Sequence, residues 1–266
     1  MPAPFPLPRW RHLAARLRAL VPSDCPLCAS RGRGGMLCAA CEDAACRTAR
    51  TLPGLGLPWR CARCALPLPE HDTACPDCAD LAPAFSRTII AFDYAPPADA
   101  LVLQLKNGRR YGRADLLGNL LAEAVRHQPQ PLESGTVLVP IPASFASLRR
   151  RGFNPAAEIA RALGRDLALP VRHDLLRRRR EQAKQSGLGR LGRREAVRGL
   201  YACAPQARGL CVGLVDDVMT TGSTLHAAAA ALRMAGAASV VALAVARTPG
   251  QFPAGLRARP RAECRD

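Results

Sequence analysis

The stretch LCVGLVDDVMTTGST, residues 210–224, decides the fold of this chain. Its apolar beginning predicts a strand buried on both faces, as the strands of parallel sheets are. The alanine-rich sequence after it predicts a helix, and an anion is favoured at a helix N-terminus. Between the two, backbone N–H groups and hydroxyls are offered by Thr220, Thr221, Gly222, Ser223 and Thr224, which we call the phosphate loop. Gly222 would let the backbone approach a phosphate closely.

Two adjacent carboxylates, Asp216 and Asp217, stand at the carboxyl end of this predicted strand. Ligands of open α/β sheets bind at that end. A carboxylate pair beside a phosphate loop suits a ligand that carries both hydroxyls and a phosphate, such as a ribose 5-phosphate. The alternative is a dinucleotide-type strand whose acidic residues only cap the next helix. We favour the first interpretation because strand, acid pair and loop occur together.

The length and charge of the chain give weaker indications. Its 266 residues are enough for about two domains, and its formal net charge of +17 comes almost wholly from arginine. A basic surface gains affinity for a polyanion such as single-stranded DNA, but GC-rich coding would also enrich arginine, and charge alone does not decide. No apolar run approaches the roughly 20 residues that span a bilayer. Arginines interrupt residues 9–21, which argues against a signal peptide and predicts a short basic amphipathic helix in a cytoplasmic protein.

Four Cys-x-x-Cys pairs lie in the first third of the chain. They are formed by Cys25, Cys28, Cys38, Cys41, Cys61, Cys64, Cys75 and Cys78. Two such pairs complete a tetrahedral thiolate site, and in a cytosolic chain metal binding is favoured over disulfides. The spacing predicts two structural zinc ribbons; iron–sulfur or redox use is the alternative. Which pairs share an ion, and whether one or both sites hold metal, stays open.

Alternating strand and helix patterns fill the rest of the chain and predict a mostly parallel sheet. Strands are expected at residues 88–94, 136–142, about 169–173, 196–201, 210–215 and 239–246, and helices at 96–106, 113–126, 155–163 and 224–234. Residues 177–198 are rich in arginine and glycine and predict a mobile loop that closes over a substrate. We expect a basic segment at 1–20, a double zinc ribbon at 21–84, a catalytic-type domain at 85–250 and a basic tail at 251–266.

The acid pair with its loop is similar to the phosphoribosyl-pyrophosphate motif of type I phosphoribosyltransferases. Together with the cysteine pairs, the Val139–Pro142 and Arg151–Asn154 segments and the stretch 182–201, it resembles the ComF family of competence-associated proteins over about residues 21–248. The resemblance implies a type I phosphoribosyltransferase-like α/β fold preceded by a small four-cysteine zinc-ribbon domain. Pro155 and Ala196 depart from the family pattern, which usually has glutamine and asparagine there.

The resemblance also implies a ligand and its contacts. Phosphoribosyl pyrophosphate would bind with its 5-phosphate on the phosphate loop and its ribose hydroxyls on Asp216 and Asp217, the candidate catalytic residues. Its pyrophosphate, with Mg²⁺, would face the loop that holds Pro142, Arg149, Arg150 and Arg151. Arginines there would bind by charge-assisted hydrogen bonds, unless they form only a solvated run.

Two functions follow from these expectations. The first is a phosphoribosyltransferase of nucleoside metabolism with an implied role in DNA uptake during natural transformation, whose acceptor the sequence does not identify. The second is a non-catalytic adaptor that uses the pocket as a sensor and binds single-stranded DNA or a DNA-processing protein. The presence of Asp216 and Asp217 favours ligand binding for both functions. The two functions differ in whether the bound ligand reacts.

Overall fold

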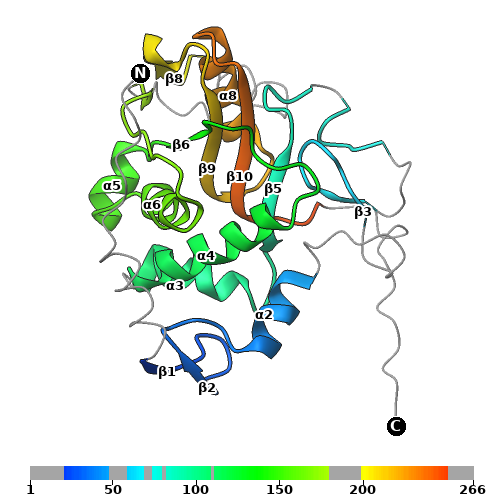
Figure 1. Cartoon of the computed structure of the whole chain (residues 1–266), viewed down its shortest axis with the longest axis vertical. Coiled ribbons are helices and arrows are strands. Elements are labelled where there is room, and N and C mark those ends of the chain that lie inside the picture. The colour runs from blue at the N-terminus through cyan, green and yellow to red at the C-terminus, as the bar shows by residue number, and fades with distance from the viewer. Residues whose placement is uncertain are drawn as a thin grey trace.

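The computed structural model describes residues 21–47, 59–68, 74–79, 82–108, 111–179 and 199–250. Its centre is a sheet of four parallel strands in the order β5-β10-β9-β6 (Figure 1). The strands are β5 (Thr88–Asp93), β6 (Val137–Pro140), β9 (Cys211–Met219) and β10 (Ser239–Arg247). The expected parallel sheet is therefore confirmed. The strand with the carboxylate pair lies in its interior, between β6 and β10.

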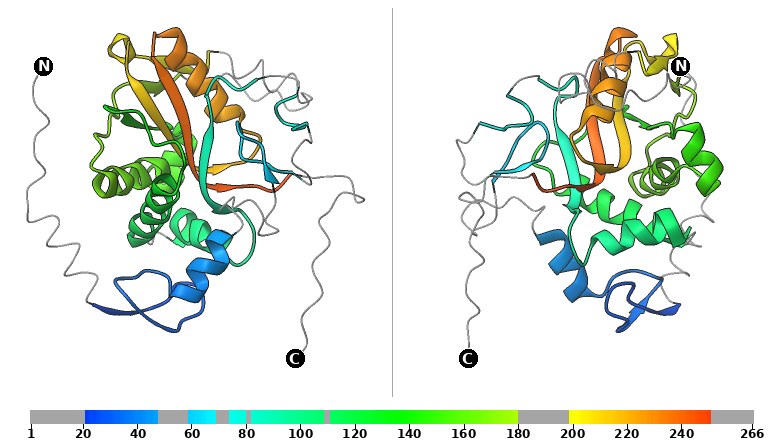
Figure 2. Two further views of the ribbon diagram at one scale, coloured as in Figure 1. Left: turned by 45° about the vertical axis from the view of Figure 1, so that its right-hand side comes forward. Right: turned by 180° about the vertical axis from the view of Figure 1, so that it is seen from behind.

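Helices cover both faces of the sheet, as Figure 2 shows. One face is covered by α3 (Asp99–Gly108), α4 (Gly112–Arg126) and α6 (Pro155–Leu167). The other is covered by α8 (Ser223–Met234) and by an antiparallel hairpin of β7 (Leu176–Arg178) and β8 (Tyr201–Cys203). Side chains of a strand alternate between faces, so Val215 packs in the first core and Leu214 in the second. None of the helices in the described ranges is both long and apolar enough to cross a membrane.

The residues just before α6 and α8 explain why these helices begin where they do. Asn154 caps α6 by accepting a hydrogen bond from the Ala156 N–H at 3.2 Å, and Pro155 takes the first helical position, where no N–H is needed. The helix α8 begins directly after Gly222, whose φ is +74°. The last turn of α8 is followed by Gly236 at φ +90°, which ends the helix as expected.

Two expectations about this part of the chain are wrong. Residues 169–173 do not form a strand: only Val171 bridges to Leu138 of β6, because Pro170 and Pro140 have no N–H with which to continue the pairing on either side. The loop after β6 contains a short helix, α5 (Phe145–Arg151), whose N-cap Ser144 accepts from the Ser147 N–H at 3.2 Å. The predicted amphipathic helix, the basic tail and most of the predicted mobile loop lie outside the described residues.

The cysteine-rich segments pack on different parts of the body. The hairpin of β1 (Pro22–Asp24) and β2 (Arg31–Arg33) and the helix α2 (Ala39–Cys46) join the core that contains α3 and α4. The hairpin of β3 (Trp59–Arg60) and β4 (Pro67–Leu68) joins the core on the other face, next to β5 (Figure 1). The four-cysteine domain expected before the sheet is thus present as two small units that contact the body separately.

Candidate functional site

The carboxylate pair lies near the carboxyl end of β9, and its two side chains meet different neighbours. Asp217 forms an ion pair with Lys106 of α3, with 2.9 Å between Oδ1 and Nζ. Asp216 accepts a hydrogen bond from the backbone N–H of Asp217 at 2.9 Å. Because side chains alternate along a strand, Asp217 faces the α3 side, whereas Asp216 faces the side of the β7–β8 hairpin.

The surroundings of Asp216 favour its protonated form. Removal from water and the negative charge of Asp217 raise the pKa of Asp216 to about 8, against the opposing effects of the Asp217 N–H and of Lys106. Tyr201 of β8 is 4% exposed, and burial raises its pKa to about 12; the charge of Asp216 adds to this shift, and Arg178 opposes it. The pKa of Asp216 is thus far above its ordinary value beside a second carboxylate, and strongly shifted pKa values are frequent at functional sites.

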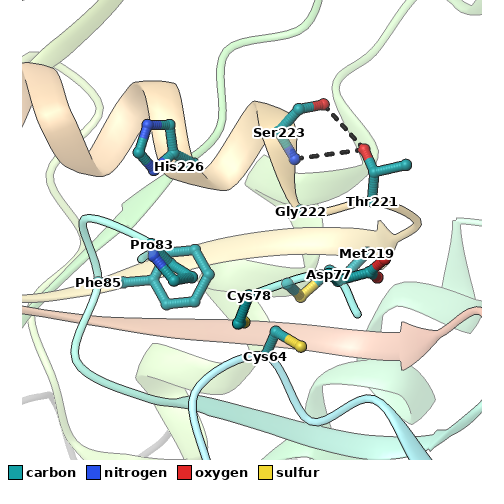
Figure 3. Close-up of a pocket in the computed structure, with 10 residues that line it drawn as sticks. All are labelled: Cys64, Asp77, Cys78, Pro83, Phe85, Met219, Thr221, Gly222, Ser223 and His226. Atoms are coloured by element: carbon teal, nitrogen blue, oxygen red, sulfur yellow. Dashed lines mark hydrogen bonds between the residues drawn. The ribbon is translucent and has the colours of Figure 1, made fainter. Parts of the chain in front are cut away.

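The phosphate loop joins β9 to α8 and presents hydroxyls at the helix N-terminus. The Thr221 and Ser223 hydroxyls are 3.0 Å apart, and the Ser223 N–H donates to Thr221 Oγ1 at 3.4 Å. Thr220 and Thr221 are exposed. A small pocket separates the loop from Cys64, Cys78 and Asp77 of the cysteine-rich segment (Figure 3). Open hydroxyls and N–H groups at this position suit an anion.

Gly222→Ala is expected to weaken binding of inorganic phosphate and of ribose 5-phosphate by about tenfold, and to lower the free energy of unfolding by about 1–2 kcal/mol. Gly222 has φ +74°, which strains any residue with a Cβ, and that Cβ would lie 2.5 Å from Cε of Met219, so the Met219 side chain or the loop must shift. Calorimetric titration of wild type and variant measures the effect. Gly135→Ala is the matched control, because Gly135 has a similar φ of +76° with open space around it. Equal losses in the two variants would contradict the assigned role of Gly222.

The loop after β6 begins beside the carboxylate pair. The Ile141 N–H donates to the carbonyl of Val215 at 2.8 Å, and Asn154 Nδ2 donates to the carbonyl of Ile141 at 2.9 Å. These bonds bring Pro142 next to the strand that bears Asp216. The arginines lie further along, in the last turn of α5, where the Arg149 guanidinium lies 5.8 Å from the centre of the Phe145 ring. Within the described ranges, no hydrogen bond or ion pair joins Arg149, Arg150 or Arg151 to the carboxylate pair or the phosphate loop.

The eight cysteines form two clusters in which all four sulfur atoms lie within 4.8 Å of one another. The first cluster is Cys25, Cys28, Cys38 and Cys41, and the second is Cys61, Cys64, Cys75 and Cys78. Sulfur pairs lie 3.7 Å apart in the first (Cys28 and Cys38) and 3.5 Å apart in the second (Cys64 and Cys75). A tetrahedral zinc thiolate site has about 3.8 Å between sulfurs, whereas a disulfide has about 2 Å. Both clusters therefore fit zinc, and the question of pairing is answered: neighbouring pairs along the chain combine.

Comparison with known proteins gives the family. Residues 142–252 match the model of the phosphoribosyl transferase domain. Over 233 residues the chain is 32% identical to the DNA utilization protein YhgH of Escherichia coli strain K12, covering 86% of this chain and 98% of that protein. It is also 28% identical over 195 residues to competence protein F of Haemophilus influenzae, covering 70% and 84% of the two chains. The chain belongs to the ComF family. Another member, competence protein ComFC of Bacillus subtilis, is 39% identical over 110 residues, which cover 40% of this chain and 41% of that protein.

Three residues near the carboxylate pair of this ComF family member were not predicted as site residues. They are Lys106, Arg178 and Tyr201, which lie on the elements α3, β7 and β8 and not on β9 itself. One signal was available for Lys106: it is one of two lysines in a chain with 38 basic residues. Nothing in the local sequence indicates that Tyr201, with Arg178 next to it, lies near Asp216, because this arrangement depends on how the β7–β8 hairpin packs on the sheet.

Proposed function

We propose that this protein binds phosphoribosyl pyrophosphate or a related ribose phosphate together with Mg²⁺. The observation that carries the proposal is the carboxylate pair at the end of β9, followed directly by the phosphate loop at the N-terminus of α8. The match of residues 142–252 to a phosphoribosyl transferase domain supports it. The domain is proposed to span residues 85–250, after a cysteine-rich region at 21–84.

Each part of the ligand has a proposed partner. The 5-phosphate would bind the phosphate loop, where Thr220 and Thr221 are exposed just before the N-terminus of α8. The ribose hydroxyls would donate to Asp216 and Asp217, so Asp216 would release its proton when the ligand binds. The pyrophosphate would bind near Pro142, with Mg²⁺ and the α5 arginines Arg149, Arg150 and Arg151 neutralising its charge. Since these arginines are partly exposed and lie beyond hydrogen-bonding distance of the pair, they would have to move toward the ligand.

The two cysteine clusters are proposed to hold one structural zinc ion each. Four thiolates per site leave no open position, so the metal would stabilise the fold and would not take part in a reaction. Each cluster orders a segment that is too short to fold around its own apolar residues. In the second cluster, for example, Leu66 is buried in a core that it shares with Phe85 and other residues of the body.

The names of the relatives support a proposed role in DNA uptake during natural transformation. We propose a cytoplasmic location as well. These names concern DNA utilization and competence, and the charge of +17 suits a polyanionic partner such as single-stranded DNA.

The same names favour a second candidate, a non-catalytic adaptor that senses ribose phosphate and engages DNA or a DNA-processing protein. As an enzyme, the protein would transfer the phosphoribosyl group, and it would stabilise the departing pyrophosphate by charge.

Phosphoribosyl pyrophosphate with Mg²⁺ is expected to raise the melting temperature of the wild type by about 5–10 °C at a hundred times its Kd. The variant Asp216→Asn/Asp217→Asn is expected to show no shift, because amides cannot replace two anionic acceptors of ribose hydroxyls. Differential scanning fluorimetry measures both. Asp115→Asn is the control: this carboxylate pairs with Arg165 at 2.7 Å, between α4 and α6, and should leave the ligand shift intact.

A wild type that gains no stability from phosphoribosyl pyrophosphate would refute the binding proposal. A protein that binds is then assayed for release of pyrophosphate with a panel of nucleobases. Release that depends on a base identifies a transferase, and binding without release identifies the sensor.

A further inference from the structure

Arg247, the last residue of β10, is buried to an unusual degree. It is 1% exposed and is the sole charged residue among the buried residues of the described ranges. A guanidinium has no uncharged form in proteins, so a buried arginine needs acceptors for its five N–H groups. The identity of those acceptors shows which parts of the molecule Arg247 holds together.

One side of the guanidinium binds the segment of the second cluster. Nη2 forms an ion pair with Oδ2 of Asp77 at 2.6 Å, and Nε donates to the carbonyl of Cys64 at 3.1 Å. Cys64 is itself a member of that cluster, and Asp77 stands between the members Cys75 and Cys78. Both acceptors therefore belong to the two tight turns that bring the four thiols together.

The other side of the guanidinium binds the start of the phosphate loop. Nη1 donates to the carbonyls of Thr220 and of Thr248 (2.8 Å for the latter), with a longer contact of 3.4 Å to the carbonyl of Met219. The Thr248 N–H in turn donates to the Met219 carbonyl at 3.0 Å. Figure 3 shows Asp77, Met219 and the loop residues Thr221, Gly222 and Ser223 around one small pocket. The Arg247 side chain thus connects the second cluster with Thr220, the first residue of the phosphate loop.

We propose that Arg247 and Asp77 couple the metal state of the second cluster to the shape of the phosphate loop, so that a ribose phosphate binds tightly only when this cluster holds its metal. The inference rests on the proposed function of the loop. When the turns around the cluster open, the guanidinium loses Asp77 and the Cys64 carbonyl, and its remaining bonds no longer fix the Thr220 carbonyl. Coupling of this kind is reciprocal, so the ligand also strengthens retention of the metal.

A second ion pair provides a matched comparison. Arg60 of β3 pairs with Asp93 of β5, with 2.7 Å between Nη2 and Oδ2, and both side chains are mostly buried. This pair fastens the same cysteine-rich segment to the sheet, but within the described residues none of its hydrogen bonds reaches the phosphate loop. If docking of the segment were all that mattered, the loss of either pair would have the same effect on the loop.

The test compares zinc-loaded wild type, Asp77→Asn, Asp77→Glu and Asp93→Asn. Titration calorimetry with phosphoribosyl pyrophosphate and Mg²⁺ is expected to show affinity lowered about tenfold or more in Asp77→Asn and by less than about threefold in Asp93→Asn, with part of the affinity recovered in Asp77→Glu. In parallel, transfer of zinc to a chromogenic chelator is followed with and without phosphoribosyl pyrophosphate. The ligand should slow release of one zinc equivalent from the wild type and should have no such effect in Asp77→Asn.

Two outcomes overturn the coupling: unchanged affinity in Asp77→Asn, or equal losses in Asp77→Asn and Asp93→Asn. A wild type that does not bind phosphoribosyl pyrophosphate refutes the proposed function instead, and hydrogen exchange then decides the coupling without any ligand. Removal of zinc, or Asp77→Asn, should speed exchange of the Thr248 amide, whose acceptor is the Met219 carbonyl. Asp93→Asn should leave it unchanged, and equal exchange in all variants overturns the inference.

Discussion

Asp216→Asn is expected to stabilise the folded protein by up to about 5 kcal/mol at pH 8 and by only about 1–2 kcal/mol near pH 5. Burial and the charge of Asp217 raise the pKa of Asp216 to about 8, so ionisation of this carboxylate costs free energy in the native state. An asparagine has nearly the same shape and is uncharged at every pH. The variant therefore avoids a free-energy cost that the wild type meets at neutral and alkaline pH.

The pH dependence follows from the direction of the shift. Between about pH 4, where the unfolded carboxyl titrates, and about pH 8, the folded state keeps a proton that the unfolded state has released. Over that range the wild type loses up to about 1.4 kcal/mol of stability for each pH unit of increase, and above it the full cost is reached. The difference between variant and wild type should accordingly grow from about pH 5 to about pH 8.

Urea unfolding at three pH values measures this difference. Asp115→Asn is the control, because this carboxylate pairs with Arg165 between α4 and α6 and is not among the groups that shift the pKa of Asp216. This control should show no gain that grows with pH. A variant Asp216→Asn that differs from wild type by the same amount at pH 5 and pH 8 would contradict an Asp216 that is protonated in the folded state. Binding sites often contain a group that lowers the stability of the folded protein because function requires it.

Local sequence was sufficient for the parts of the fold that depend on local physics. The strands near residues 88–94 and 239–246 and the strand-to-helix passage at Asp216 to Ser223 are where apolar runs and helix signals predict them. A short run such as residues 169–173 was misjudged, because periodicity does not tell a paired strand from an extended connection that touches one edge of a sheet.

Contacts between distant residues could not be predicted in this way. Lys106 reaches Asp217 only because α3 covers one face of the sheet, and Asp77 reaches Arg247 only because the cysteine-rich segment packs at the end of β10. The order of strands in the sheet creates both pairings, and no single stretch of sequence carries that order. The motif at the end of β9 therefore predicted the candidate ligand, but not the side chains that control the charge and position of the site.

Cys61→Ser is expected to lower the metal content from two zinc ions per chain to one and to open the segment around the second cluster to proteases. Loss of one thiolate from a closed four-thiolate site removes most of a metal-binding free energy on the order of 10 kcal/mol. Without it, Leu66 and Phe85, which are 0% and 2% exposed, have too few apolar partners to keep the segment in place. Elemental analysis and limited proteolysis measure the two effects.

Cys211→Ser is the matched control for this variant. Its thiol lies outside both clusters and donates to Oε2 of Glu133 at 3.0 Å, a bond that a serine hydroxyl can also make. Zinc content and protease resistance should stay at wild-type values. Folded wild type with less than one zinc per chain would refute the zinc assignment itself. A Cys61→Ser variant that loses one zinc ion but keeps a protected segment would show that packing on β5 suffices to hold the segment, and the second cluster would then have no structural need for its metal.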